Sequence, residues 1–261
     1  MFKLIFKLIV FSALVVACSN IERDNPLDPK NPDSISETPI LIEAFINTTF
    51  DYDNRAIEGL DQIKAQFGDN LKFEIVEYHR ANQNWPASSD PFENPEFTPL
   101  HKTYADTYED GSIAVPDIYI NGSEGRVLGA SDAESVYDRL ASILTDIGVQ
   151  QSNYSLEIDL SASGTLVNVN YRVARLGDQT DENLELHIIF IENDYNTGFR
   201  PVARKITYPN VELINKLNAG EYAEGNINNI SCPNHPDYAI FTITKQDDIT
   251  VLKTLKKEIL W

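Results

Sequence analysis

Cysteine is scarce in this sequence, and positive charge is in short supply. Only Cys18 and Cys232 occur among 261 residues, which excludes a scaffold held together by several disulfides. Lys and Arg number 21 against 40 Asp and Glu, so the formal net charge is −19. Because the phosphates of nucleic acids attract positive surfaces, we expect no nucleic-acid partner.

Long apolar runs are also lacking. The longest, Leu8–Val16, is about half of the roughly 20 residues that a membrane-spanning helix needs. The sequence does contain 42% hydrophobic and 10% aromatic residues, which is enough for substantial cores. At 261 residues the chain is long enough for two domains of ordinary size.

The first 17 residues have the three-part pattern of a secretory signal peptide. Lys3 and Lys7 supply the positive start, Leu8–Val16 is the apolar region, and Ala17 is the small residue at its end. We therefore expect residues 1–17 to be removed during export.

The string Val15–Cys18 resembles the lipobox of bacterial lipoproteins, in which an aliphatic and a small residue precede cysteine. The resemblance implies that the Cys18 thiol is lipidated, with acyl chains such as palmitate, and anchors the mature protein in a membrane of the cell envelope. Ser19 in place of aspartate favours the outer membrane, on either its periplasmic or its surface side. A plain signal peptide cut near Ala17, or a single membrane anchor, stays an alternative.

Residues 18–38 read as the lipidated N-terminus and a flexible tether. The stretch contains three prolines and many Asp, Asn and Ser residues, and it has no periodic apolar face. At about 3.1 Å per residue such a segment reaches roughly 60 Å. The carboxylates of Asp24–Pro29 suggest a calcium loop, but the glycine and the terminal glutamate of an EF-hand are missing.

An alternation of strands and helices begins at residue 39. Residues 39–45 form a short apolar run typical of a buried strand. Helical spacing of apolar residues follows from Asp51 until Gly68, and residues 71–78 predict a second strand. After a long irregular segment, residues 112–121 and 126–128 predict a hairpin and residues 133–147 a closing helix. This order is typical of a thioredoxin-like domain, which we place at residues 39–150.

The sequence resembles a family of bacterial lipoproteins related to the 28-kilodalton outer-membrane protein. The resemblance lies in Leu41–Phe45 and the helix after it, in Asp90–Glu96, and in Ile113–Pro116. It implies a thioredoxin-like domain followed by a β-rich domain. Many members carry a Cys-x-x-Cys motif at the start of the first helix, and the matching positions here are Phe50 and Asp53.

The loss of both cysteines predicts a protein that is not an enzyme and uses no cofactor. Disulfide exchange needs a thiolate at an exposed helix N-terminus, where the helix dipole lowers its pKa. Asp51 and Asp53 suit the same dipole as capping residues. Their alternative role is to hold a cation or the amine of a ligand.

Pro116 is expected to be cis, by analogy with the proline that faces the thioredoxin active site. Backbone beside such a proline accepts an extended peptide, and this role survives the loss of thiols. A purely structural role for the proline is the alternative. The predicted face for a protein or peptide partner consists of Phe50, Asp51, Tyr52, Asp53, Val115 and Pro116.

The insertion at residues 80–110 is long for a compact domain. Five aromatic residues within it form either a recognition surface or a local core: Trp85, Phe92, Phe97, Tyr104 and Tyr108. His79 and His101 lie at its edges, but no spacing matches a known metal motif, and we expect no metal site.

Residues 151–261 have alternating patterns that predict about six strands and an antiparallel β-sandwich. Cys232 and His235 are three positions apart, but no second pair of zinc ligands accompanies them. We interpret them as loop residues. No nucleophile elbow or phosphate loop occurs in the sequence.

Three functions remain open at this point. The first is a non-catalytic envelope lipoprotein that binds a protein or peptide. The second is a thiol–disulfide oxidoreductase or isomerase, against which the missing Cys-x-x-Cys argues. The third is a purely structural lipoprotein.

Overall fold

A computed structural model describes residues 28, 31, 33–80, 90–108, 111–194, 200–207, 212–246 and 248–261. The predicted signal peptide, the Cys18 lipidation site, Asp24–Leu27 and Trp85 lie outside these residues. Within the described part, no helix is both long and apolar enough to cross a membrane.

The N-terminal half is built on four strands. β2 (Ile40–Ile46) pairs in parallel with β3 (Phe73–His79) and antiparallel with β4 (Asp117–Ile120), which pairs with β5 (Gly125–Leu128). All seven residues of β2 are buried. A strand covered on both faces is expected to be continuously apolar, which explains why this run lacks alternation.

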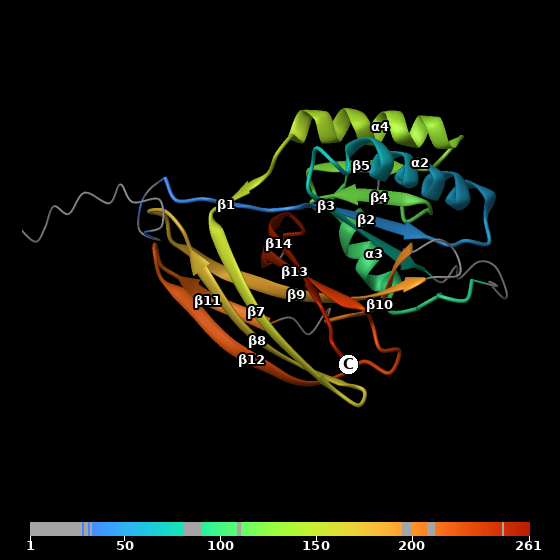
Figure 1. Cartoon of the computed structure of the whole chain (residues 1–261). Coiled ribbons are helices and arrows are strands. Elements are labelled where there is room, and N and C mark those ends of the chain that lie inside the picture. The colour runs from blue at the N-terminus through green and yellow to red at the C-terminus, as the bar shows by residue number, and fades with distance from the viewer. Residues whose placement is uncertain are drawn as a thin grey trace, which may run out of the picture.

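Helices cover both faces of these strands. α2 (Asp51–Phe67) and α4 (Ala133–Ile147) lie on one face, and α3 (Phe97–Asp106) lies on the other (Figure 1). α2 and α4 touch closely at Gly59, where a Cβ atom would lie 2.8 Å from the side chain of Val136. Glycine therefore sets the distance between the two helices.

The C-terminal half is β-rich, as predicted. Two layers enclose a common core: β7, β8 and β12 form one sheet, and β9, β10, β11, β13 and β14 belong to the other. The sheets of the described part are mixed or antiparallel, and none is closed. The bounds are β7 (Tyr154–Ser163), β8 (Leu166–Arg175), β9 (Asp181–Asp194), β10 (Arg200–Ile206), β11 (Glu212–Leu217), β12 (Tyr222–Ser231), β13 (Tyr238–Lys245) and β14 (Val251–Glu258).

One sheet runs through both halves of the chain. β10 pairs in parallel with β3 at a single register point, Val202 with Glu77, and so joins the C-terminal strands to β2, β4 and β5. The division into two domains at residue 150 stays a prediction. The shared sheet means that separating the halves would expose the edge of β3.

The predicted tether, residues 18–38, includes residues at its C-terminal end that pack against the folded body. β1 (Ser36–Glu37) pairs with β6 (Gln151–Ser152), and Ser34 and Thr38 are buried. Lys253 further fixes this segment, because its ammonium donates to the Glu37 carbonyl at 2.6 Å. Composition alone could not show these contacts, because their partners lie more than 100 positions away.

Three further expectations require correction. The insertion is not wholly irregular, since α3 lies within it and buries Phe97 and Tyr104, which supports the local-core interpretation for these two aromatics. The strand expected at 112–121 begins only at Asp117. The described part of the C-terminal half has eight strands of six or more residues rather than about six. The sequence missed β11, which has only six residues, and β12, which is rich in Asn and Gly that strands usually lack.

Candidate functional site

Three segments of the chain meet at one edge of the sheet. β2 ends at Ile46 and leads into α2, while β3 ends at His79 and continues into Arg80. Because β4 is antiparallel to β2, with Asp117 opposite Phe45, residues 111–116 enter the sheet at this edge. The topology therefore brings the two predicted halves of the binding face, 50–53 and 115–116, to the same end of the sheet.

The start of α2 presents two aromatic rings. Phe50 occupies the N-cap position without a side-chain cap, and its ring stacks on Tyr52 with centroids 6.0 Å apart. Tyr52 is 50% exposed, and Asp51 is exposed in the first turn. The outer surface of this turn is thus aromatic and acidic.

Asp53 behaves differently from the expected helix cap. Its side chain is fully buried, and neither carboxylate oxygen has a hydrogen-bond partner in the described part of the chain. Burial raises the pKa of Asp53 to about 7, and the Asp90 carboxylate adds to the rise. The Asn47 backbone and the positive charges of His79 and Arg80 oppose it. The carboxyl group therefore titrates near neutral pH.

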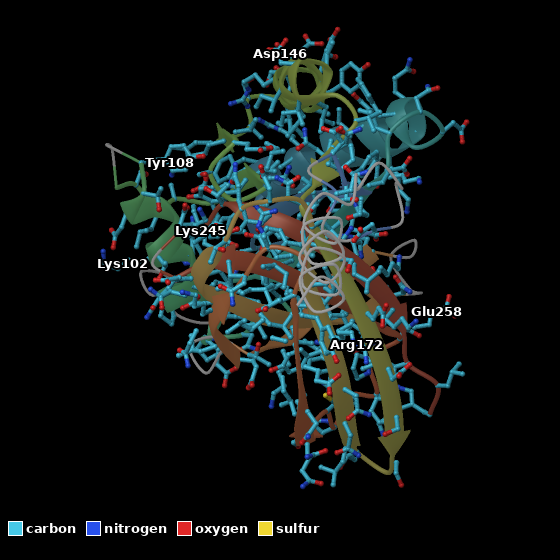
Figure 2. The ribbon with its side chains drawn as sticks, turned by 90° about the vertical axis from the view of Figure 1, so that its left-hand side faces the viewer. Lys102, Tyr108, Asp146, Arg172, Lys245 and Glu258 are labelled. Carbon is cyan, nitrogen blue, oxygen red and sulfur yellow. The ribbon has the colours of Figure 1, made fainter. Side chains whose placement is uncertain are left out.

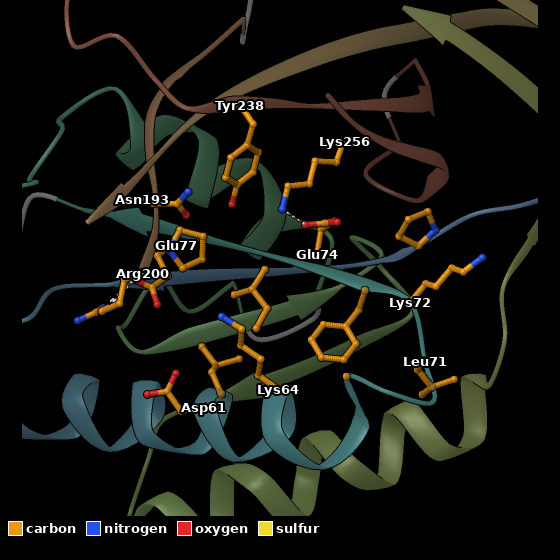
Figure 3. A pocket seen from close by; sticks show the side chains of 16 residues that line it. Asp61, Lys64, Leu71, Lys72, Glu74, Glu77, Asn193, Arg200, Tyr238 and Lys256 are labelled. Atoms are coloured by element: carbon orange, nitrogen blue, oxygen red, sulfur yellow. Dashed lines mark hydrogen bonds and ion pairs between the residues drawn. The ribbon is translucent and has the colours of Figure 1, made fainter. Parts of the chain in front are cut away.

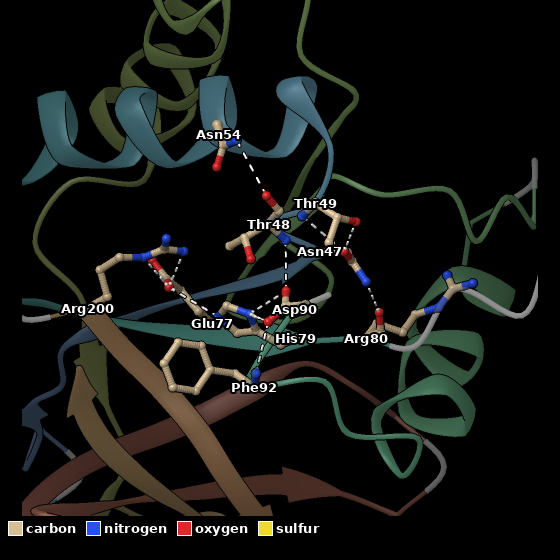
Figure 4. A network of polar contacts seen from close by, with 10 residues as sticks. All are labelled: Asn47, Thr48, Thr49, Asn54, Glu77, His79, Arg80, Asp90, Phe92 and Arg200. Carbon is tan, nitrogen blue, oxygen red and sulfur yellow. Dashed lines mark hydrogen bonds and ion pairs between the residues drawn. The ribbon is translucent and has the colours of Figure 1, made fainter. Parts of the chain in front are cut away.

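His79 and Asp90 form an ion pair beneath the loop between β2 and α2 (Figure 4). The His79 Nδ1 lies 2.9 Å from Asp90 Oδ2, which also accepts the Thr48 backbone N–H at 2.8 Å. Burial disfavours the imidazolium, yet Asp90 and Glu77 together raise the pKa of His79. Burial also disfavours the Asp90 carboxylate, yet the His79 bond lowers the pKa of Asp90 to about 2. The pair fixes the loop as a charged unit.

A second chain of polar contacts holds residues 111–116. Arg80 donates to the Ile113 carbonyl and lies 2.9 Å from Nδ1 of His101. Because an arginine N–H can only donate, His101 Nε2 carries the proton and donates to Asp117 at 2.8 Å. Arg126 bonds Asp117 and also donates to the Ser112 carbonyl at 2.7 Å. Two guanidinium groups thus clamp the backbone just before Pro116.

The clamped backbone is open to solvent. Ile113 and Ala114 are exposed, and no described residue forms a hydrogen bond with the backbone of Ala114 or Val115. The Val115–Pro116 peptide bond is cis, which confirms the expectation from the sequence. The segment therefore offers unused main-chain donors and acceptors beside a fixed proline.

Glu43 is an acid that the sequence did not mark as special. It lies in the apolar run of β2, is 1% exposed, and accepts hydrogen bonds from Tyr78 at 2.9 Å and Tyr104 at 2.8 Å. Burial raises the pKa of Glu43 to about 7 although both tyrosines lower it. Its position could have identified it, because an acidic residue inside an apolar run that is predicted to be a buried strand must be buried as well.

Two large hollows lie elsewhere on the molecule. A groove of about 480 Å³ separates α2 from β13 and β14 along the open edge of β3 (Figure 3). Its charges are largely paired internally, since Lys256 bonds Glu74 and Arg200 bonds Glu77. A second cavity of about 530 Å³ has Glu43 in its wall.

Cys232 and His235 do not form a reactive pair. Cys232 is buried, and burial raises the pKa of its thiol to about 11. The ring of His235 stacks on Trp261 with centroids 4.5 Å apart. The described residues contain no group of three or more His, Cys, Asp or Glu that could hold a metal ion.

Comparisons with known proteins identify the fold but no family. No family model and no curated protein matches the sequence. The structure is similar to HBP35 of Porphyromonas gingivalis, with a TM-score of 0.61 and 9% identity over 85% of this chain and 76% of that one. It is also similar to a structural-genomics protein from Agrobacterium tumefaciens, with a TM-score of 0.53 and 13% identity over 85% and 94%. These structural relatives are bacterial, and likeness at such low identity concerns the fold alone.

Proposed function

We propose that this chain is a lipid-anchored lipoprotein of the bacterial cell envelope that binds an extended segment of another protein and catalyses no reaction. Its binding face consists of the first turn of α2 and residues 113–116. The proposal includes a thioredoxin-like N-terminal half, related to the 28-kilodalton outer-membrane lipoproteins. The element order β2-α2-β3-α3-β4-β5-α4 and the cis Pro116 support that interpretation.

The unpaired backbone of Ala114 and Val115 carries the proposal. An extended peptide that pairs with a strand-like segment gains main-chain hydrogen bonds whatever its sequence. Arg80 and Arg126 already hold this segment through the carbonyls of Ile113 and Ser112, so little ordering remains to oppose binding. Tyr52, 50% exposed, and Ile113, 38% exposed, supply apolar surface at the same edge of the sheet.

The chemistry of the face supports a binding role rather than catalysis. In the proposed thioredoxin alignment, Phe50 and Asp53 take the positions of the redox thiols, and neither side chain exchanges disulfides. The remaining thiol in the described part, Cys232, lies in the core of the C-terminal half, where its raised pKa keeps it protonated. An oxidoreductase would therefore need a site of another kind.

Photo-crosslinking in the native envelope tests the proposal. Benzoylphenylalanine replaces Tyr52 in one variant and, as a matched control, Tyr222 in another; both tyrosines are exposed, and Tyr222 lies on β12 in the other half of the chain. We expect an adduct of defined mass only with the Tyr52 variant. Adding Ile113→Asp should reduce its yield severalfold, because a charge replaces apolar surface.

The outcomes separate the competing functions. Equal labelling at both positions, or none at either, would contradict a partner at this face and favour a purely structural lipoprotein. An adduct that forms without irradiation and that dithiothreitol releases would point instead to a mixed disulfide and to an oxidoreductase.

A further inference from the structure

The cavity of about 530 Å³ lies on the side of the sheet that α3 covers, and its described lining shares no residue with the proposed binding face. α3, β9, β13 and the segment before β14 contribute its walls, and Glu43 reaches it from β2. Apolar side chains, among them Ile189, Ile206 and Val251, also line it. Its volume suits a small molecule, since ligand sites commonly measure about 300–1,000 Å³.

The charge of the lining has one sign. Four carboxylates contribute to it, those of Glu43, Asp106, Glu185 and Asp248, and its described residues include no Lys or Arg. One of them is paired from outside the lining, since Lys102, which lies on the outer side of α3 (Figure 2), bonds Asp106. His187 adds no positive charge, because burial lowers its pKa to about 4. A cation therefore suits this cavity electrostatically, whereas an anion would be repelled.

A second observation, independent of the carboxylates, also points to a ligand. Thr242 lines the cavity and is 3% exposed, yet no hydrogen bond to its hydroxyl is formed by any residue in the described ranges. The Thr242 hydroxyl is therefore available to bond a molecule inside the cavity. The neighbouring Thr244 differs, since its hydroxyl lies 3.0 Å from His187 Nε2.

We propose that this cavity binds a small aliphatic amine, with an ammonium group on the carboxylate of Glu43 and its carbon chain along the isoleucines. The ammonium group supplies N–H donors to carboxylate oxygens and to the Thr242 hydroxyl. The apolar part of the lining matches the alkyl chain and disfavours a fully hydrated metal ion. This site is separate from the proposed peptide face and does not depend on it.

Glu43 gives the site a pH dependence. Burial raises its pKa to about 7, so the group is largely protonated at pH 6 and ionised at pH 8. An ammonium group prefers the carboxylate, so its affinity should rise with pH over this interval. The groups facing Glu43 stay neutral meanwhile: burial keeps the pKa of Tyr78 and of Tyr104 well above 10, and His187 is uncharged. Asp106, Glu185 and Asp248 lie around the same cavity.

Calorimetric titration of the full chain in detergent with 1,5-diaminopentane tests the inference. We expect one saturable site for the diamine, at least tenfold tighter at pH 8 than at pH 6, and no binding of 1,5-pentanediol, which has the same length without charge. A blocked lysine peptide is the second arm. If it binds as tightly as the diamine, the amine belongs to a side chain of a partner rather than to a free metabolite.

Variants locate the site. Glu43→Gln keeps a side chain that can accept from one tyrosine and donate to the other, and it should weaken diamine binding tenfold or more. Thr242→Val, nearly isosteric, should weaken it severalfold. Glu224→Gln, on the exposed surface of β12, is the control for attraction to the acidic protein as a whole and should change nothing. If Glu43→Gln does not fold, Thr242→Val and the pH profile decide. Unchanged affinity in Thr242→Val together with a flat pH profile would overturn the proposal, as would equal binding of the diol.

Discussion

Replacing Asp53 by Asn should stabilise the protein at alkaline pH and have a much smaller effect in acid. Asp53 is buried beneath the start of α2, and its oxygens lack partners among the described residues. Asparagine resembles the protonated acid in size and polarity but cannot ionise. The substitution therefore removes the cost of a buried negative charge and leaves most of the packing in place.

The magnitude follows from the shift in pKa. The Asp53 pKa is about 7 in the folded protein against 3.8 for the unperturbed group. The folded state thus holds a proton that the unfolded state loses, so stability falls as pH rises from about 4 to about 7 and is constant above. At about 1.36 kcal/mol per pKa unit, the total cost is on the order of 4 kcal/mol, of which about 3 kcal/mol develops between pH 5 and pH 8.

Urea unfolding at pH 5 and pH 8 measures this difference. The stability of Asp53→Asn relative to the wild type should increase by about 3 kcal/mol between the two conditions. Any cost of the buried amide itself is the same at both and cancels. Asp51→Asn, two residues away but exposed, is the control and should show no such change. A pH-independent difference between Asp53→Asn and wild type would refute the claim that Asp53 ionises at the expense of stability.

Three other predictions concern the anchor, the chemistry and the packing. Cys18→Ser should release the protein from the membrane fraction and abolish acyl labelling; membrane attachment of this variant, with no label on the wild type, would contradict lipidation. The wild type should not reduce insulin disulfides above a protein-free control, whereas the double variant Phe50→Cys, Asp53→Cys should gain measurable insulin-reducing activity. A double variant that folds but stays inactive would count against the thioredoxin alignment. Gly59→Ala should lower the free energy of unfolding by about 1–3 kcal/mol in urea titrations, because its Cβ would lie 2.8 Å from Val136. An unchanged midpoint of urea unfolding would mean that α2 and α4 separate freely.

The regular elements of the N-terminal half were predictable because each has a local signal. β2 is a continuous apolar run, and α2 ends at Gly68 as its sequence indicates. The position of Pro116 beside the end of β2 also followed, since the order of the elements determines which strand ends share an edge. Local pattern and topology were sufficient for these features.

The electrostatics of the site were not predictable from the same patterns. Asp53 has the sequence position of a helix cap, and only the tertiary packing shows that it is buried and without hydrogen-bond partners. Arg80 and Arg126 stand 46 positions apart, yet both donate to carbonyls of one backbone segment, and His101 and Asp117 link them. Such contacts depend on the fold as a whole, and no spacing in the chain encodes them.

The pairing of β1 with β6 fixes the point at which the N-terminal chain joins the sheet. This point lies at the end where β2 begins, and β2 then runs seven residues, about 20 Å, before reaching α2 (Figure 1). With Cys18 anchored as proposed, the point of attachment and the proposed binding face are therefore at opposite ends of one strand.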